Sequence, residues 1–294
     1  MNLHVLFVRL TSALALAGTL LAADSAYRQQ IETYREQREK TLKADGGWLT
    51  VTGLFWLNPG ANSLGSAPDN DVLLPEGAPA HLGQVIIDGA AARLDASADG
   101  VTYNGKPVKE SAISYANPAG VVSYGSFDLL LLKRGDRFAL RLKDRNSAIR
   151  KSFTHLNWYP VQEDWRVKAR FVPNQGPTKL VFDTVVGGRE EAPSPGYVEF
   201  ERQGHTYRLL ASGQGRRLFF VIRDSTSGKT TYGASRFLYA DVPGPDNVVV
   251  LDFNKAENPP CAFTPYATCP LPPPQNRLSL AIDAGEQKYA GSAH

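Results

Sequence analysis

Short runs of apolar and β-branched residues, separated by turn residues about every 8–12 positions, dominate the chain from Trp48 onward. This spacing is typical of antiparallel β-sandwiches and barrels. The runs span 48–57, 83–87, 101–103, 127–133, 137–142, 167–172, 179–186, 197–202, 205–210, 218–223, 232–239, 248–253 and 278–282. Two turns, Arg134-Gly135-Asp136 and Gln203-Gly204, join neighbouring runs and predict β-hairpins.

A helical pattern precedes the strands. Ser25 can cap a helix in which Tyr27, Ile31 and Tyr34 form one apolar stripe, and charged residues cover its other faces. Gly46-Gly47 ends this pattern. The fold class that we predict is all-β, with two antiparallel sandwich-like or barrel-like domains, 47–147 and 148–290, preceded by one amphipathic helix within 24–46.

Residues 1–23 have the order of a secretory signal peptide: Arg9, then an uncharged apolar run from Leu10 to Leu21, then Ala22-Ala23. The run is too short for a membrane span, which takes about 17–25 apolar residues. No cysteine follows it for lipid attachment. We therefore expect cleavage near Ala23 and a periplasmic or secreted protein without a stable membrane anchor.

Charge excludes one class of partner. The whole chain has a formal charge of +3 with 32 basic and 29 acidic residues, so it lacks the basic excess that nucleic acids or anionic membranes require. No nucleic-acid partner is expected.

Two strings of residues resemble a bacterial family known only as domain of unknown function 1684. The first is Trp48-Leu-Thr-Val-Thr-Gly-Leu-Phe-Trp-Leu57, and the second is Arg223-Asp-Ser-Thr-Ser-Gly-Lys-Thr-Thr-Tyr-Gly233 with Leu251-Asp-Phe-Asn-Lys255, Asn258-Pro-Pro-Cys-Ala-Phe263, Cys269-Pro-Leu-Pro272, Asn276-Arg-Leu278 and Ala284-Gly-Glu286. The resemblance implies no established activity.

The stretch from Asn62 to Val108 is similar to a forkhead-associated domain, a β-sandwich that binds phosphothreonine. In that family an Arg follows the first Gly, and a Ser-Arg-x-His turn holds the phosphate. Here Ser66 follows Gly65, and His81 stands in Pro79-Ala-His-Leu82. Phosphate recognition needs donors of the Arg type. We therefore expect the sandwich without phosphopeptide binding.

The remaining polar residues gather around a long, proline-rich loop from Asn254 to Gln275. Long ordered loops are usually functional or tightly pinned. One interpretation is that the polar side chains hydrogen-bond the loop backbone. The other is a cleft that binds a ligand. The candidate ligand-binding residues are Arg236, Asp252, Asn254, Asn258, Asn276, Arg277 and Glu286.

Cys261 and Cys269 predict a disulfide in an oxidising compartment, with free thiols or a metal site as alternatives. A closed zinc site needs four ligands, and no such spacing occurs, so no metal and no cofactor is expected. Ser227-Gly-Lys-Thr-Thr231 imitates a phosphate-binding loop but lacks its first Gly.

The leading hypothesis is a non-catalytic binding module for a small polar, anionic or saccharide-like ligand, or a peptide, in the C-terminal domain. A metal-independent hydrolase that uses Asp252 and Glu286 as a carboxylate pair is the alternative. A structural role in the envelope is a third possibility.

Overall fold

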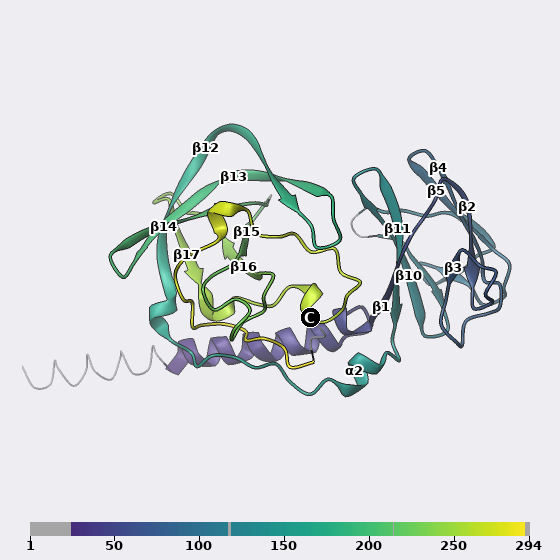
Figure 1. Cartoon of the computed structure of the whole chain (residues 1–294), viewed down its shortest axis with the longest axis horizontal. Helices are drawn as coiled ribbons and strands as arrows, with labels where there is room; N and C mark the ends of the chain where they lie inside the picture. Colours follow the sequence, from purple (N-terminus) through teal and green to yellow (C-terminus); the bar gives the residue numbers. More distant parts are fainter. Residues whose placement is uncertain (1–24, 117–118, 214, 292–294) are drawn as a thin grey trace, which may run out of the picture.

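The computed structural model describes residues 25–116, 119–213 and 215–291. Two β-rich bodies lie side by side, and a helix over residues 25–43 runs along the second (Figure 1). The predicted signal peptide, residues 1–23, lies outside the described residues. No helix in the part of the chain that the structure describes is long and apolar enough to cross a membrane.

The N-terminal helix packs through the stripe that its sequence predicts. Ile31 is fully buried and Tyr27 nearly so, and both cluster with Val161. The helix ends before Gly47, where a Cβ would lie 2.1 Å from the Leu42 carbonyl oxygen. Only glycine permits this close approach of the departing chain to the last helical turn.

The first body, residues 51–144, is a sandwich of two sheets (Figure 1). Its six-stranded sheet runs in the order β1 (Val51–Trp56), β11 (Arg137–Asp144), β10 (Phe127–Arg134), β9 (Val121–Tyr124), β6 (Thr102–Tyr103) and β7 (Lys106–Pro107). Its five-stranded sheet runs β3 (Val72–Leu73), β2 (Gly60–Gly65), β4 (Gly83–Asp88), β5 (Ala91–Ala96) and β8 (Glu110–Ala112). Alternate residues of both sheets, such as Leu94 and Leu140, form one buried core.

A short connection joins the bodies. It contains α2 (Ala148–Ser152), whose N-cap Ser147 accepts a hydrogen bond from the Arg150 amide at 3.2 Å.

The predicted run 48–57 begins instead with a 3₁₀ turn, Trp48–Thr50, and becomes a strand at Val51. The Thr50 hydroxyl donates to the Gly47 carbonyl at 2.7 Å, which holds this turn closed.

The second body, residues 166–286, is built on a four-stranded antiparallel sheet. The order is β14 (His205–Ala211), β13 (Arg189–Arg202), β12 (Arg166–Asp183) and β17 (Val248–Asp252). A two-stranded sheet, β15 (Arg217–Ile222) and β16 (Arg236–Asp241), lies under the β12–β13 hairpin (Figure 1). Two predicted strands, 167–172 and 179–186, are one long strand here, with a shift of register between Pro173 and Thr178.

Both predicted hairpin turns are confirmed. Arg134-Gly135-Asp136 connects β10 to β11, and Gln203-Gly204 connects β13 to β14. Gln203 and Gly204 have φ values of 52° and 75°, the pair of positive angles that a two-residue turn of type I′ requires. The turn fixes the register of β14 against β13, and His205 is paired with Arg202.

The predicted strand 278–282 is wrong in one respect. Leu278, Leu280 and Ile282 are buried while Arg277 and Ser279 are exposed, so the alternation is real. The segment forms no strand of a sheet, however, and its one bridge is parallel, from Arg277 to Arg223. Alternation shows which face is buried, but it does not supply a neighbour for the backbone.

Replacing Ile31 by Ala is expected to lower the free energy of unfolding by about 2–4 kcal/mol, because it leaves a cavity under the helix. The matched control is Gln30→Ala, at an exposed position of the same helix, which should change it by less than about 0.5 kcal/mol. Urea unfolding followed by tryptophan fluorescence measures both. Equal effects of the two substitutions would show that the helix does not pack on this stripe.

Candidate functional site

Arg236, at the start of β16, is fully buried and hydrogen-bonded within the chain. One terminal nitrogen donates to Asp224 at 2.7 Å and to the Ile282 carbonyl at 3.0 Å, and the other donates to the Ala284 carbonyl at 2.5 Å. Both members of the Arg236–Asp224 ion pair are shielded from solvent. The pair therefore fastens residues 282–284 to β16.

Asp252 and Asn254 attach the N-terminal helix. The Tyr27 hydroxyl donates to Asp252 at 2.8 Å, and the Asn254 amide donates to the Tyr27 oxygen at 2.9 Å and to the Gln162 carbonyl at 2.7 Å. Burial and the neighbouring Asp252 carboxylate raise the pKa of Tyr27 well above its usual value. The phenol therefore remains a hydrogen-bond donor at any ordinary pH.

Glu286 and Asn258 form a second attachment to the same helix. The Asn258 backbone amide and side-chain amide donate to Glu286 at 3.1 and 2.9 Å. Arg38 lies 3.4 Å from both Glu286 and Glu257. Burial raises the pKa of the fully buried Glu286 to about 7, although Arg38 opposes this shift.

The Asn276 side chain bonds backbone groups of β14 and β15 that, among the described residues, have no neighbouring strand at this point. Its side-chain oxygen accepts from the Leu210 amide at 2.7 Å, and its side-chain nitrogen donates to the Leu210 and Val221 carbonyls at 3.0 Å each. The next residue, Arg277, is exposed, and its Nε donates to the Pro272 carbonyl at 3.1 Å.

Within the described part of the chain, the seven predicted ligand-binding residues are divided among several hydrogen-bond networks. Six of them are buried and hydrogen-bonded to the segment 253–287 or to its neighbours, and only Arg277 reaches the surface groove described below. Asp252 and Glu286 belong to separate hydrogen-bond networks. The carboxylate pair of the hydrolase hypothesis stays a prediction.

The predicted disulfide is not formed. Cys261 and Cys269 are buried free thiols, and the Cys261 amide donates to the Cys269 sulfur at 3.3 Å. Hydrogen bonding to Cys261, together with burial, raises the pKa of the Cys269 thiol. Both thiols lie in one apolar cluster, and their sulfurs are not at disulfide distance. Among the described residues, no group of three or more His, Cys, Asp or Glu residues could hold a metal ion.

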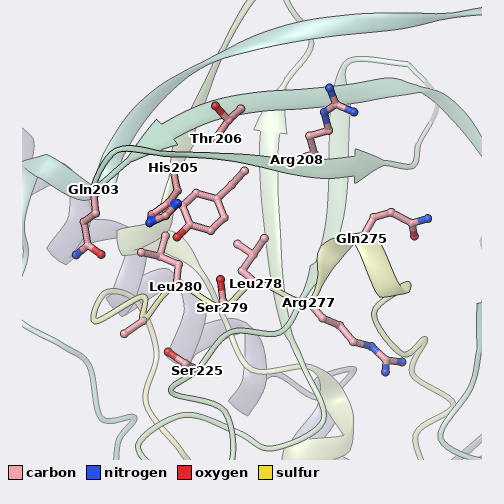
Figure 2. A pocket seen from close by; sticks show the side chains of 12 residues that line it. Gln203, His205, Thr206, Arg208, Ser225, Gln275, Arg277, Leu278, Ser279 and Leu280 are labelled. Carbon is pink, nitrogen blue, oxygen red and sulfur yellow. The ribbon is translucent and has the colours of Figure 1, made fainter.

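A groove of about 780 Å³ opens between β14 and the segment 275–281, and we call it the β14 groove (Figure 2). Tyr207, Leu278 and Leu280 supply its apolar surface, while polar side chains surround them. The remaining lining residues are Gln203, His205, Thr206, Arg208, Ser225, Gln275, Arg277, Ser279 and Ala281.

The side chains that line the β14 groove include two arginines and a histidine but no carboxylate. Arg208 donates to Glu199 on β13 at 2.7 Å, and Arg170 also contacts Glu199, so this trio carries one net positive charge. Arg277 forms no ion pair with a described residue and extends away from the groove floor (Figure 2). The rim of the β14 groove therefore carries net positive charge.

A second hollow, of about 480 Å³, lies between the two bodies. Trp56, Arg134 and Arg137 line it from the first body, and the β12–β13 turn lines it from the second. Its three arginines, Arg134, Arg137 and Arg189, are compensated in part by the two carboxylates of the lining, Asp136 and Glu190, and Arg134 pairs with Glu190 at 2.7 Å. This hollow has no comparable excess of positive charge.

Sequence reasoning found Arg277 but missed the β14 side of the groove. His205 to Arg208 looked like an ordinary strand, and the sequence carried no sign that this strand lies at an open edge. The order β14-β13-β12-β17 puts it there.

The fold and the groove define an all-β protein with a polar surface site in its second body. Residues 151–287, which include the whole groove, match the model of a family described as a protein of unknown function, DUF1684. This match confirms the family resemblance for the second half of the chain.

Solved structures are similar to parts of the chain. A solution NMR structure of an uncharacterized protein from Haloarcula marismortui is 28% identical over 47% of this chain and 78% of its own, with a TM-score of 0.40. An FHA domain from a study of phosphothreonine-dependent FHA domain interactions is 20% identical over 31% of this chain and 92% of its own, with a TM-score of 0.23.

The FhaA FHA domain, solved with the intracellular domain of a partner protein, is 21% identical over 30% of this chain and 96% of its own, with a TM-score of 0.22. The forkhead-associated domains are thus among the structural neighbours of this chain. A search of curated proteins found no match.

Arg236→Ala is expected to lower the free energy of unfolding by about 3–5 kcal/mol, because it leaves Asp224 as a buried charge without its partner. The control Lys179→Ala removes an exposed pair with Glu191 and should cost less than about 1 kcal/mol. Chemical denaturation of both variants provides the comparison. A loss below about 1 kcal/mol for Arg236→Ala would contradict a stabilising role for the buried pair.

Glu286 makes stability fall as pH rises. Its pKa is about 7 in the folded chain and near 4.5 when exposed, so between these values the native state binds more protons than the unfolded state. The expected loss from pH 4.5 to pH 7 is about 3 kcal/mol.

Glu286→Gln should remove this decline, since the amide does not titrate. Urea unfolding at a series of pH values measures it, with the exposed Glu110→Gln as control. An unchanged pH profile in Glu286→Gln would show that another group causes the decline.

Proposed function

We propose that this protein is an exported, non-catalytic binding module that holds a polar, anionic ligand in the β14 groove. The observation that carries this proposal is a groove rim with Arg277, Arg208 and His205 and no carboxylate among the lining side chains. Charge-assisted hydrogen bonds from arginine are the strong, directional contacts that select carboxylates and phosphates.

The shape of the groove supports the same proposal. Its volume of about 780 Å³ falls within the range of small-molecule sites, about 300–1,000 Å³, and its walls are held by buried contacts. Leu278 and Leu280 are anchored in the main core of the second body, and Asn276 fixes the end of the wall at Leu210. A ligand therefore meets a largely preformed site and loses little affinity to ordering.

The buried polar network supports the binding module indirectly. Asn276 fastens the start of the segment 275–281 to Leu210 and Val221, and backbone bonds of Leu278 and Leu280 to residues 223–225 hold the rest. Arg277 and the β14 residues remain for binding. Export to the periplasm or the medium is part of this proposal, and it rests on the pattern of residues 1–23.

Arg277→Ala is expected to weaken binding of small anions by about tenfold or more, the loss of one charge-assisted hydrogen bond. Isothermal titration with citrate, glucuronate and inorganic phosphate measures it. The matched control is Arg137→Ala, which removes an arginine from the second hollow and should leave these affinities unchanged. Binding that survives Arg277→Ala and disappears in Arg137→Ala would move the site to the second hollow.

A further inference from the structure

We propose that the β14 groove takes an extended acidic peptide, which pairs with the free edge of β14 as an added strand. This inference rests on the binding function proposed above and specifies the class of its ligand. The two walls of the groove carry free backbone groups, which a small anionic ligand does not need.

The first wall is the outer edge of β14. The Leu210 N–H and C=O groups are both bonded by the Asn276 side chain, so they face away from β13. Backbone groups of an antiparallel strand alternate in direction from one residue to the next. Thr206 and Arg208 therefore also direct their N–H and C=O groups outward, and the pairing of His205 with Arg202 next to the turn gives the same parity.

These outward groups are unpaired. Within the described residues, the backbone of Thr206 and of Arg208 has no hydrogen-bond partner on this side, and both residues are exposed. An exposed strand edge with free donors and acceptors is a template for a further strand.

The second wall also has free backbone groups. The Leu278 amide donates to Arg223 at 2.7 Å, and the Leu280 carbonyl accepts from Ser225 at 3.0 Å. Both residues therefore face residues 223–225, and Ser279 between them faces the other way. Ser279 lines the groove, and its N–H and C=O groups have no backbone partner among the described residues.

The walls stay apart because of Asn276. Its side-chain amide provides the two hydrogen bonds that a neighbouring strand would give Leu210, and after it the β14 groove lies between residues 277–281 and β14. The ladder that stops at Leu210 leaves the length from His205 to Arg208 open. Four residues of strand span about 13 Å, enough for a short extended peptide.

The side chains indicate what that peptide carries. Tyr207, Leu278 and Leu280 offer apolar contacts on the inner side, whereas Arg277 and His205 lie at the rim. Side chains alternate along a strand, so a peptide with acidic residues at every second position would face the rim with its carboxylates and the floor with its apolar residues.

The experiment uses the full mature chain and a library of end-capped hexapeptides. Every second position is Asp or Glu and the others are degenerate, and a matched library carries Lys at the same positions. Peptides enriched from the acidic library are resynthesised, and their dissociation constants are measured by fluorescence anisotropy.

Thr206→Pro is the decisive variant. Proline removes one outward N–H and leaves the pairing of β14 with β13 intact, a position at which strand edges tolerate it. We expect it to weaken peptide binding at least about tenfold more than Thr206→Ala, which removes the same side-chain hydroxyl but keeps the N–H. Alternate amides of the peptide can be N-methylated in two ways, at the odd or at the even positions. One of these two sets should weaken binding to the unaltered protein by a similar factor, because only one set of amides points toward β14. This tests the pairing without any protein variant.

Three outcomes would overturn the inference. One is enrichment from the Lys library equal to that from the acidic library. Another is an unchanged dissociation constant when the unmodified peptide binds Thr206→Pro and when the N-methylated peptides bind the unaltered protein. The third is concentration-dependent dimers that Thr206→Pro abolishes, because the edge would then pair with a second copy. If citrate or glucuronate still binds in an Arg277-dependent way while no peptide binds, this inference fails and the proposed function stands.

Discussion

Buried side chains hold the last part of this chain in place by bonding its backbone. From Phe253 to Gln287 the described chain contains only short 3₁₀ turns, isolated bridges and coil, yet much of it is buried. An unpaired backbone group in the interior costs about 1–3 kcal/mol, so such a segment can be buried only if partners are supplied. Arg236 supplies them for the Ile282 and Ala284 carbonyls, and Asn258 supplies one for the Gln287 carbonyl. Asn276 fastens the segment from the other side, because its own side chain bonds the backbone of Leu210 and Val221.

This constraint also explains where a ligand site can and cannot lie. A guanidinium that is fully buried and donates to Asp224 and to two carbonyls is not within reach of a ligand from solvent. Asn276, by contrast, has two effects. Its hydrogen bonds to Leu210 fasten its own segment, and they also occupy the edge of β14 at that residue, so that the edge is open only before it. The β14 groove is thus bounded by the same buried hydrogen bonds that hold the segment 275–281 in place, and its walls are as rigid as those bonds.

The sequence predicts the strands and hairpins well, because alternation and turn chemistry are local properties. Gln203-Gly204 gives both the turn type and the register of β14. The sequence also singles out Arg236, but as a candidate ligand-binding residue, whereas the structure pairs it with the buried Asp224. The sequence does not show whether the seven candidate ligand-binding residues face a cleft or the loop backbone, because a ligand site and a network of structural hydrogen bonds use the same residue types. The open edge of β14 depends on strand order, which no local pattern encodes.

The N-terminal helix closes the second body from the far end of the sequence. Tyr27 bonds Asp252 across 225 positions, and Arg38 meets Glu286 across 248. The helix is synthesised first and its partners almost last, so it must wait for nearly the whole chain before it can dock. Contacts between residues so far apart in the sequence slow folding. The helix can dock only after the C-terminal residues that bond it have been synthesised. A chain cut short before Glu286 would leave Arg38 without its most buried partner.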